Sequence, residues 1–371
     1  MKKLLFVLLL ILCCFMLPVE ADRGAFPVLS AQAAILIDAR SGFPLYEKNA
    51  DSELPMASTT KILTALITLE NAEVFDEAVL ITQESASVEG SSMGLREGWH
   101  VRLSSLAAGM LLASGNDAAN TAAIALGGTL ENFAALMNAR AEELGLSHTH
   151  FETPSGLDGP EHYSSARDLA MLAREAMKNE RFAALTSSRE ANAEILSPKM
   201  TLTLGNHNKL LRLCEGCIGV KTGYTKRAGR CLVSCVEREG VRLIAVTLND
   251  PDDWNDHLAL FEAGFSSLSQ RNIPEVSVRI PVIGGERGKV TVSSGLIRLP
   301  LFEGEEIETQ FSCPALLYAP IEQGENLGCA VFRLGGEVIA QAPLTAIERC
   351  AASSEEVKLS LWEKIKKFFR T

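Results

Sequence analysis

The sequence has no excess of positive charge: 35 Lys and Arg against 46 Asp and Glu give its 371 residues a formal net charge of −11. A nucleic-acid-binding protein needs a basic face, so that class is excluded. Glycine (28) and proline (14) are too few for a collagenous or low-complexity chain. No internal repeat of roughly 20–50 residues is visible, which excludes solenoids and propellers. With 47% hydrophobic residues, the chain is expected to be globular, with two or three domains.

The apolar run near the N-terminus is too short to span a membrane. Residues 4–17 are uninterrupted and apolar, and they follow Lys2 and Lys3. A helix of this length reaches about 21 Å, short of a hydrocarbon core of about 30 Å. Val19-x-Ala21 fits the small-residue rule for signal-peptidase cleavage. We therefore expect residues 1–21 to be a signal peptide and the chain to be exported; the alternative is an uncleaved anchor.

The last residues have the pattern of a short amphipathic helix. One face would carry the apolar and aromatic side chains Leu361, Trp362, Ile365, Phe368 and Phe369. The other would carry mainly the basic side chains Lys364, Lys366, Lys367 and Arg370. Such a helix lies in a membrane interface, so residues 351–371 are expected to be a linker and a peripheral membrane anchor. The alternative is a terminal helix packed on its own domain.

The sequence has only nine cysteines, and seven of them lie after the apolar run near the N-terminus. Cys214-x-x-Cys217 and Cys231-x-x-x-Cys235 loosely resemble a zinc ribbon. The second pair, however, falls in an expected strand, where positions four apart do not converge as in a zinc knuckle. We expect a cysteine pair or buried thiols rather than a metal site, and no cofactor.

The order of periodic segments indicates the fold class. Apolar strands are expected at 33–38, 43–48, 218–225, 231–237 and 241–248, and helices at 59–72, 104–113, 117–126 and 256–268. This order predicts an α/β (α+β) domain over residues 22–270, with an antiparallel sheet flanked by helices and a helical insertion. Alternating short segments after about residue 270 predict a small all-β domain over residues 271–350.

Ser58-Thr-Thr-Lys61 stands where a helix is expected to begin. Residues three apart on a helix share a face, so the Lys61 amine would lie close to the Ser58 hydroxyl. A serine hydroxyl becomes a good nucleophile only when a base takes its proton, and a desolvated amine can do so. By itself the pattern is also that of a helix cap followed by a solvated lysine.

Two further short motifs carry groups that suit the same chemistry. Ser114-Gly-Asn116 lies between two expected helices, where a hydroxyl and an amide can relay a proton and hold a lysine or a substrate carbonyl. Lys221-Thr-Gly223 lies in an expected strand and offers a cation and a hydroxyl to a carboxylate. Gly223 would leave room for a peptide along the strand edge. Taken singly, the first motif is typical of an interhelical turn, and the second is expected by chance in about one chain in ten.

Together and in this order, the three motifs are those of class A β-lactamases and penicillin-binding proteins. The sequence resembles the D-alanyl-D-alanine carboxypeptidases over essentially its whole length. Further segments that resemble this family are Pro154-Ser-Gly-Leu-Asp158, Ser165-Ala-Arg-Asp168 and Gly219-Val-Lys-Thr-Gly-Tyr-Thr225. The β-rich second domain and the amphipathic tail also resemble parts of these enzymes.

The resemblance implies a role for each motif residue. Ser58 would be acylated by the penultimate D-Ala carbonyl of a peptidoglycan stem peptide, with Lys61 as the general base and Ser114 assisting it. Asn116 would orient the substrate and Lys61, while Lys221 and Thr222 would bind the terminal carboxylate. Gly223 would line the substrate strand, and the backbone N–H groups of Ser58 and Tyr224 would form the oxyanion hole. β-Lactam antibiotics would acylate Ser58.

One departure and two alternatives remain at this point. Family members often carry a basic residue in an Asn-Arg-Asn stretch, whereas this chain has Asn206-His-Asn208, so His207 is not assigned a catalytic role. A β-lactamase would need a glutamate that positions water, and no obvious glutamate occupies residues 154–158. An inert cell-wall-binding scaffold would be expected to lack one motif, and all three are present.

Overall fold

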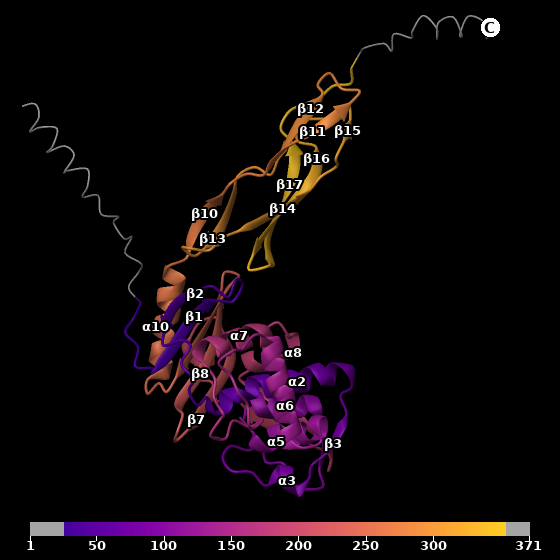
Figure 1. Cartoon of the computed structure of the whole chain (residues 1–371). Coiled ribbons are helices and arrows are strands. Elements are labelled where there is room, and N and C mark those ends of the chain that lie inside the picture. The colour runs from indigo at the N-terminus through magenta and orange to yellow at the C-terminus, as the bar shows by residue number, and fades with distance from the viewer. Residues whose placement is uncertain (1–25, 354–371) are drawn as a thin grey trace, which may run out of the picture. The chain divides into compact units, whose positions relative to one another are not determined.

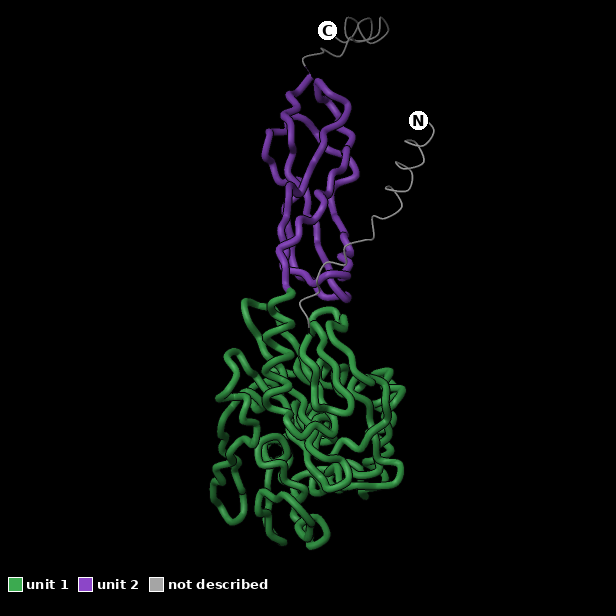
Figure 2. Tube along the Cα trace, turned by 90° about the vertical axis from the view of Figure 1, so that its left-hand side faces the viewer, with its two compact units in different colours: residues 1–267 green, residues 268–371 purple. Residues whose placement is uncertain are grey.

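A computed structural model describes residues 26–353, and the chain divides into two compact units, residues 1–267 and 268–371 (Figure 2). The expected signal peptide lies outside the described residues, as does nearly all of the expected amphipathic tail. Within residues 26–353, no helix is both long enough and apolar enough to cross a bilayer.

A five-stranded antiparallel sheet forms the centre of the first unit, with strand order β2-β1-β9-β8-β7. Its strands are β1 (Ala33–Asp38), β2 (Pro44–Lys48), β7 (Cys217–Thr225), β8 (Gly229–Arg238) and β9 (Val241–Leu248). Every residue of β1 is buried, as are most residues of β8 and β9. Helices cover both faces of these strands, which is why they read in the sequence as continuous apolar runs. β7 is an edge strand of the sheet.

Helices pack on both faces of this sheet (Figure 1). α10 (Asp253–Ser266) packs against β1, β8 and β9, and α7 (Ala166–Ala176) packs against β1 and β9 from the opposite face. The other helical segments of the unit are η1 (Ala57–Thr60), α2 (Lys61–Val74), α3 (Gln83–Ala86), α4 (Leu103–Leu111), α5 (Asn116–Gly127), α6 (Leu130–Glu143), α8 (Glu180–Ser187) and α9 (Leu210–Leu213). α2 contacts α4, α5, α7 and α8, so most of its surface is buried. A helix surrounded in this way is apolar on nearly every side.

A second, four-stranded sheet in this unit was not expected from the sequence. Its strands are β3 (Ala78–Leu80), β4 (His100–Arg102), β5 (Glu190–Ser197) and β6 (Met200–Gly205), in that order. Most residues of the β5–β6 hairpin are not buried. The hairpin is held by pairing of β5 with β4, a contact between distant parts of the chain.

The second unit consists of strands with its own apolar core. Its strands are β10 (Ser269–Ile273), β11 (Ser277–Ile283), β12 (Lys289–Ser293), β13 (Ile297–Leu301), β14 (Glu308–Ser312), β15 (Leu317–Tyr318), β16 (Asn326–Leu334) and β17 (Glu337–Ala346). β10 pairs with β13, and the other six form a sheet in the order β14-β16-β17-β12-β11-β15. Buried side chains such as Val292, Phe332 and Leu344 fill the core. The expected fold class, a mixed domain with an antiparallel sheet followed by a β-rich domain, is confirmed.

Candidate active site

Ser58 and Lys61 lie next to each other where η1 leads into α2. The Lys61 Nζ is 3.0 Å from the Ser58 Oγ. Ser58 belongs to the short 3-10 turn η1, and α2 begins only at Lys61, later than the sequence pattern indicated. η1 runs directly into α2, so the two side chains still share one face.

Lys61 is held in place by groups from two other segments. Its Nζ donates to the Asn116 Oδ1 at 2.6 Å and to the Ser155 backbone oxygen at 2.5 Å. The side chain is fully buried. Burial lowers the pKa of Lys61 well below its usual range, and the nearby charge of Lys221 lowers it further, while Asp117 raises it. The amine is thereby favoured in its neutral, proton-accepting form, next to a serine hydroxyl.

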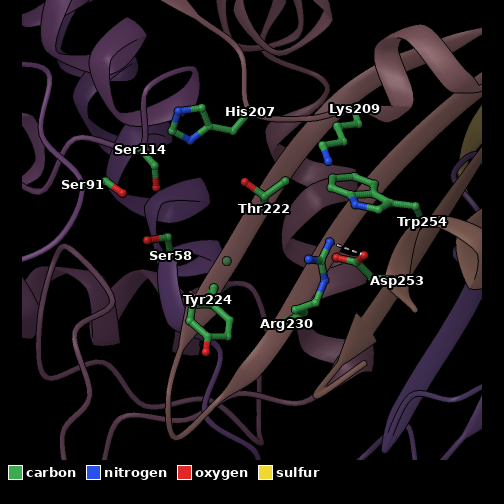
Figure 3. Close-up of a pocket in the computed structure, with 11 residues that line it drawn as sticks. Ser58, Ser91, Ser114, His207, Lys209, Thr222, Tyr224, Arg230, Asp253 and Trp254 are labelled. Atoms are coloured by element: carbon green, nitrogen blue, oxygen red, sulfur yellow. Dashed lines mark hydrogen bonds and ion pairs between the residues drawn. The ribbon is translucent and has the colours of Figure 1, made fainter. Parts of the chain in front are cut away.

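The Ser114-Gly-Asn116 segment forms the turn between α4 and α5. Ser114 has a left-handed backbone (φ 57°), which is uncommon outside glycine and indicates a constrained turn. Its side chain lies at the cleft that contains Ser58 (Figure 3). Among residues 26–353, the hydrogen-bond partners of the Lys61 amine do not include the Ser114 hydroxyl. Asn116, by contrast, links Lys61 to the Glu89 carbonyl, to which its Nδ2 donates at 2.6 Å.

Lys221, Thr222, Gly223 and Tyr224 lie along the edge strand β7. Lys221 is almost completely buried, and its Nζ donates to the Thr222 backbone oxygen at 2.8 Å. Burial lowers the pKa of Lys221 to about 7. Thr222, Gly223 and Tyr224 line the cleft, and the Tyr224 side chain is mostly exposed. The strand therefore presents the Thr222 hydroxyl to the cleft that contains Ser58, while the titratable Lys221 amine is buried and does not line the cleft.

Gly223 lies close to the Ser58 turn, a contact that the sequence did not suggest. A Cβ at this position would lie 3.1 Å from the Met56 carbonyl oxygen and from the Ser58 backbone nitrogen. The missing side chain lets β7 approach the Ser58 turn, rather than only clearing a path for a peptide. Gly156 plays a similar part, because a Cβ there would come within 2.1 Å of the Ala57 carbonyl oxygen. Gly156 also has a φ of +83°, which favours glycine.

Ser58, Ser114 and residues 222–224 line one cleft of about 470 Å³, whereas Lys61, Asn116 and Lys221 are buried and do not line it (Figure 3). Its lining residues are Ser58, Ser91, Ser114, His207, Lys209, Thr222, Gly223, Tyr224, Arg230, Asp253 and Trp254. Partial desolvation and the neighbouring Lys221 charge lower the pKa of His207, so its ring is neutral near pH 7.

Cys214 and Cys217 flank a tight turn before β7, and both thiols are free.

Two neighbours of Lys61 were missed by sequence reasoning. Ser155 acts through its backbone oxygen, so its residue type gave no signal. Asp117 accepts from the Ser92 hydroxyl and from the backbone N–H groups of residues 93–95, which fixes the loop beside the cleft. An acidic residue in the first turn of an expected helix was a visible but weak signal for it.

Comparison with known proteins points to one family. Residues 21–252 match the family model described as D-alanyl-D-alanine carboxypeptidase, Peptidase S11. D-alanyl-D-alanine carboxypeptidase DacF of Bacillus subtilis is 32% identical over 332 residues, which cover 86% of this chain and 85% of the relative. D-alanyl-D-alanine carboxypeptidase DacB2 of Mycobacterium tuberculosis is 36% identical over 260 residues, which cover 67% of this chain and 88% of the relative.

Solved structures give the same result over both units. The crystal structure of the D-alanyl-D-alanine carboxypeptidase DacD from Francisella tularensis matches with a TM-score of 0.63 and 28% identity. The match covers 92% of this chain and 98% of that one. Penicillin binding protein 5 from Haemophilus influenzae matches with a TM-score of 0.63 and 27% identity. This match covers 88% of this chain and 99% of that one.

Proposed function

Since the chain belongs to the D-alanyl-D-alanine carboxypeptidase family of serine peptidases, we propose that it removes the terminal D-alanine of peptidoglycan stem pentapeptides through an acyl-enzyme on Ser58. The observation that carries this proposal is the 3.0 Å contact between the Ser58 hydroxyl and the buried Lys61 amine. Export and peripheral anchoring at the outer face of the cytoplasmic membrane are part of the proposal, on the strength of the two terminal sequence patterns.

Acylation begins with proton transfer from the Ser58 Oγ to the neutral Lys61 amine. The Ser58 Oγ attacks the carbonyl carbon of the penultimate D-Ala, and the carbonyl oxygen becomes an oxyanion. The backbone N–H groups of Ser58 and Tyr224 are the proposed donors to it. The proximity of Ser58 N to the Gly223 position supports this arrangement. Lys221 and Thr222 hold the terminal carboxylate, which sets the scissile bond at Ser58.

Collapse of the intermediate breaks the C–N bond and releases D-alanine. Its amine takes the proton held by Lys61, with the Ser114 hydroxyl at the cleft as the proposed relay. Asn116 keeps Lys61 in position through both transfers. Water then attacks the ester carbonyl while Lys61 takes its proton. The bond between the acyl carbon and the Ser58 Oγ breaks, and Lys61 returns the proton to that oxygen, which regenerates the hydroxyl. A β-lactam would acylate Ser58 by the same steps, with its leaving amine still tethered.

The function is tested by incubating the purified chain with a diacylated L-Lys-D-Ala-D-Ala peptide and measuring released D-alanine. We expect release from this peptide and none from its L-Ala-L-Ala counterpart. A parallel incubation with benzylpenicillin should leave a persistent adduct. Rapid conversion of penicillin without an adduct would instead favour a β-lactamase, and an absence of both reactions would favour an inert scaffold.

The lowered pKa of Lys221 predicts weaker substrate binding at alkaline pH. Above about pH 7 the free enzyme loses the Lys221 charge, so the attraction for the substrate carboxylate falls. KM should rise with pH, approaching about tenfold per unit where only the charged form binds. In Lys221→Arg the cation persists at all these pH values, so any remaining binding should lose this dependence. A wild-type KM that stays flat between pH 6 and pH 9 would contradict the prediction.

A further inference from the structure

The cleft continues past the carboxylate-binding strand. In Figure 3 the Thr222 side chain lies between Ser58 on one side and Lys209 and Trp254 on the other. If Thr222 holds the terminal carboxylate, as proposed above, Lys209 and Trp254 lie on the leaving-group side of the scissile bond. The side chain of the terminal residue is the part of a substrate that would reach them.

Trp254 and Arg230 form an ordered wall of this extension. The Arg230 guanidinium lies 5.5 Å from the centre of the Trp254 ring, a cation–π contact. It also donates to the buried Asp253 carboxylate at 2.6 Å, which neutralises its charge. Arg230 comes from β8, while Asp253 and Trp254 begin α10. The wall therefore offers an aromatic face without a strong net charge.

Lys209 supplies the unneutralised charge of this extension. It is exposed, and within the part of the chain that the structure describes its ammonium has no carboxylate partner. Its backbone is fixed by the two asparagines that precede it. The Asn206 Nδ2 donates to the Thr186 and Ser188 carbonyls, and the buried Asn208 accepts from the Leu210 N–H. The turn thus presents residues 207 and 209 to the cleft, and His207 is neutral near pH 7.

We infer that Lys209, Arg230 and Trp254 form a leaving-group subsite for a terminal residue with an elongated side chain that ends in a carboxylate. The apolar stem of such a side chain would pack on the Trp254 ring, and its carboxylate would pair with Lys209. This inference rests on the proposed function, and the reaction is unchanged: Ser58 forms the same ester, and the larger residue leaves with its amine protonated. It extends the substrate class beyond terminal D-alanine.

The test compares acyl-D-Ala-X peptides in which X is D-Glu, D-Gln, D-Ala or Gly, with the released X quantified. D-Glu and D-Gln have nearly the same shape and differ in charge. We expect kcat/KM for D-Glu to exceed that for D-Gln by about fivefold, the upper range for a partly exposed ion pair. High salt should shrink this ratio. A wild-type ratio near one would overturn the inference, as would cleavage of both peptides more than about tenfold slower than the D-Ala peptide.

Variants assign the preference to the named residues. Lys209→Met should bring the D-Glu to D-Gln ratio to about one, and Lys209→Arg should retain it. The matched control is Lys226→Met, which changes an exposed lysine outside the cleft lining and should keep the wild-type ratio. Trp254→Ala should lower kcat/KM for the D-Glu and D-Gln peptides relative to kcat/KM for the Gly peptide. A ratio that survives in Lys209→Met would reject the role of Lys209. If no peptide releases X, the carboxypeptidase proposal itself fails, and the subsite fails with it.

Discussion

Ser58→Ala is expected to abolish acylation by both peptide and penicillin. The alanine lacks the only atom that could form the ester in this mechanism, and the contact with the Lys61 amine is lost with it. Removal of a nucleophile that works with its base lowers kcat by about 10⁴- to 10⁶-fold. Mass spectrometry of the intact protein after incubation with benzylpenicillin should show one adduct on the wild type and none on Ser58→Ala.

Ser91→Ala is the matched control for this experiment. Ser91 is an exposed serine at the same cleft, and its hydroxyl has no assigned role. This variant should acquire the adduct at the wild-type rate. An adduct on Ser58→Ala would show that another residue is the nucleophile. Loss of the adduct in both variants would point to a disturbed cleft rather than to the chemistry of Ser58.

Lys61→Met should slow acylation by about 10²- to 10⁴-fold, the usual contribution of a general base. Methionine has nearly the same length as lysine but cannot take the Ser58 proton. In the wild type the acylation rate should fall as pH drops through the lowered pKa of Lys61, because the protonated amine is no longer a base. The variant should lack this acid limb. Stopped-flow measurement of acylation across pH checks both effects.

Stability must be followed in the same variant. Lys61→Met leaves the Asn116 Oδ1 and the Ser155 carbonyl without their buried donor, at a cost of roughly 1–3 kcal/mol each. Part of this is offset because a buried amine is replaced by an apolar chain. Circular dichroism and thermal unfolding should therefore show a folded protein. The matched control is Lys178→Met, which changes an exposed lysine that pairs with Glu175 and should acylate normally. Acylation of Lys61→Met within tenfold of wild type would contradict the role of Lys61 as the base.

The central sheet of the first unit was predictable because local pattern and tertiary role agree there. Residues 33–38 and 241–248 are apolar runs of strand length, and both became β-strands covered on two faces. The β5–β6 hairpin was missed although residues 190–195 and 201–204 alternate polar and apolar side chains, because the alanine, asparagine and glutamate of β5 have low strand propensity. Its pairing with β4 is a contact between segments about 95 residues apart, which no local pattern encodes.

The candidate site shows the same division between side-chain and backbone information. Ser58, Lys61 and Asn116 were named from their motifs, and the fold brings their side chains into contact. The Ser155 carbonyl was not foreseeable, because every residue has a backbone oxygen and only the fold decides which one meets Lys61. Gly223 was expected to leave room for a peptide. Its close approach to the Ser58 turn could not be foreseen, because that contact exists only after β7 has packed.

By itself, the sequence determined the fold class, the family and the order of the three motifs. Those features are written in side-chain type and spacing, which survive without knowledge of distant contacts. The tertiary structure decided the lowered pKa values of Lys61 and Lys221 and the extension of the cleft to Lys209 and Trp254. Desolvation and cleft shape depend on which distant segments cover a residue, and those segments meet only when the chain folds.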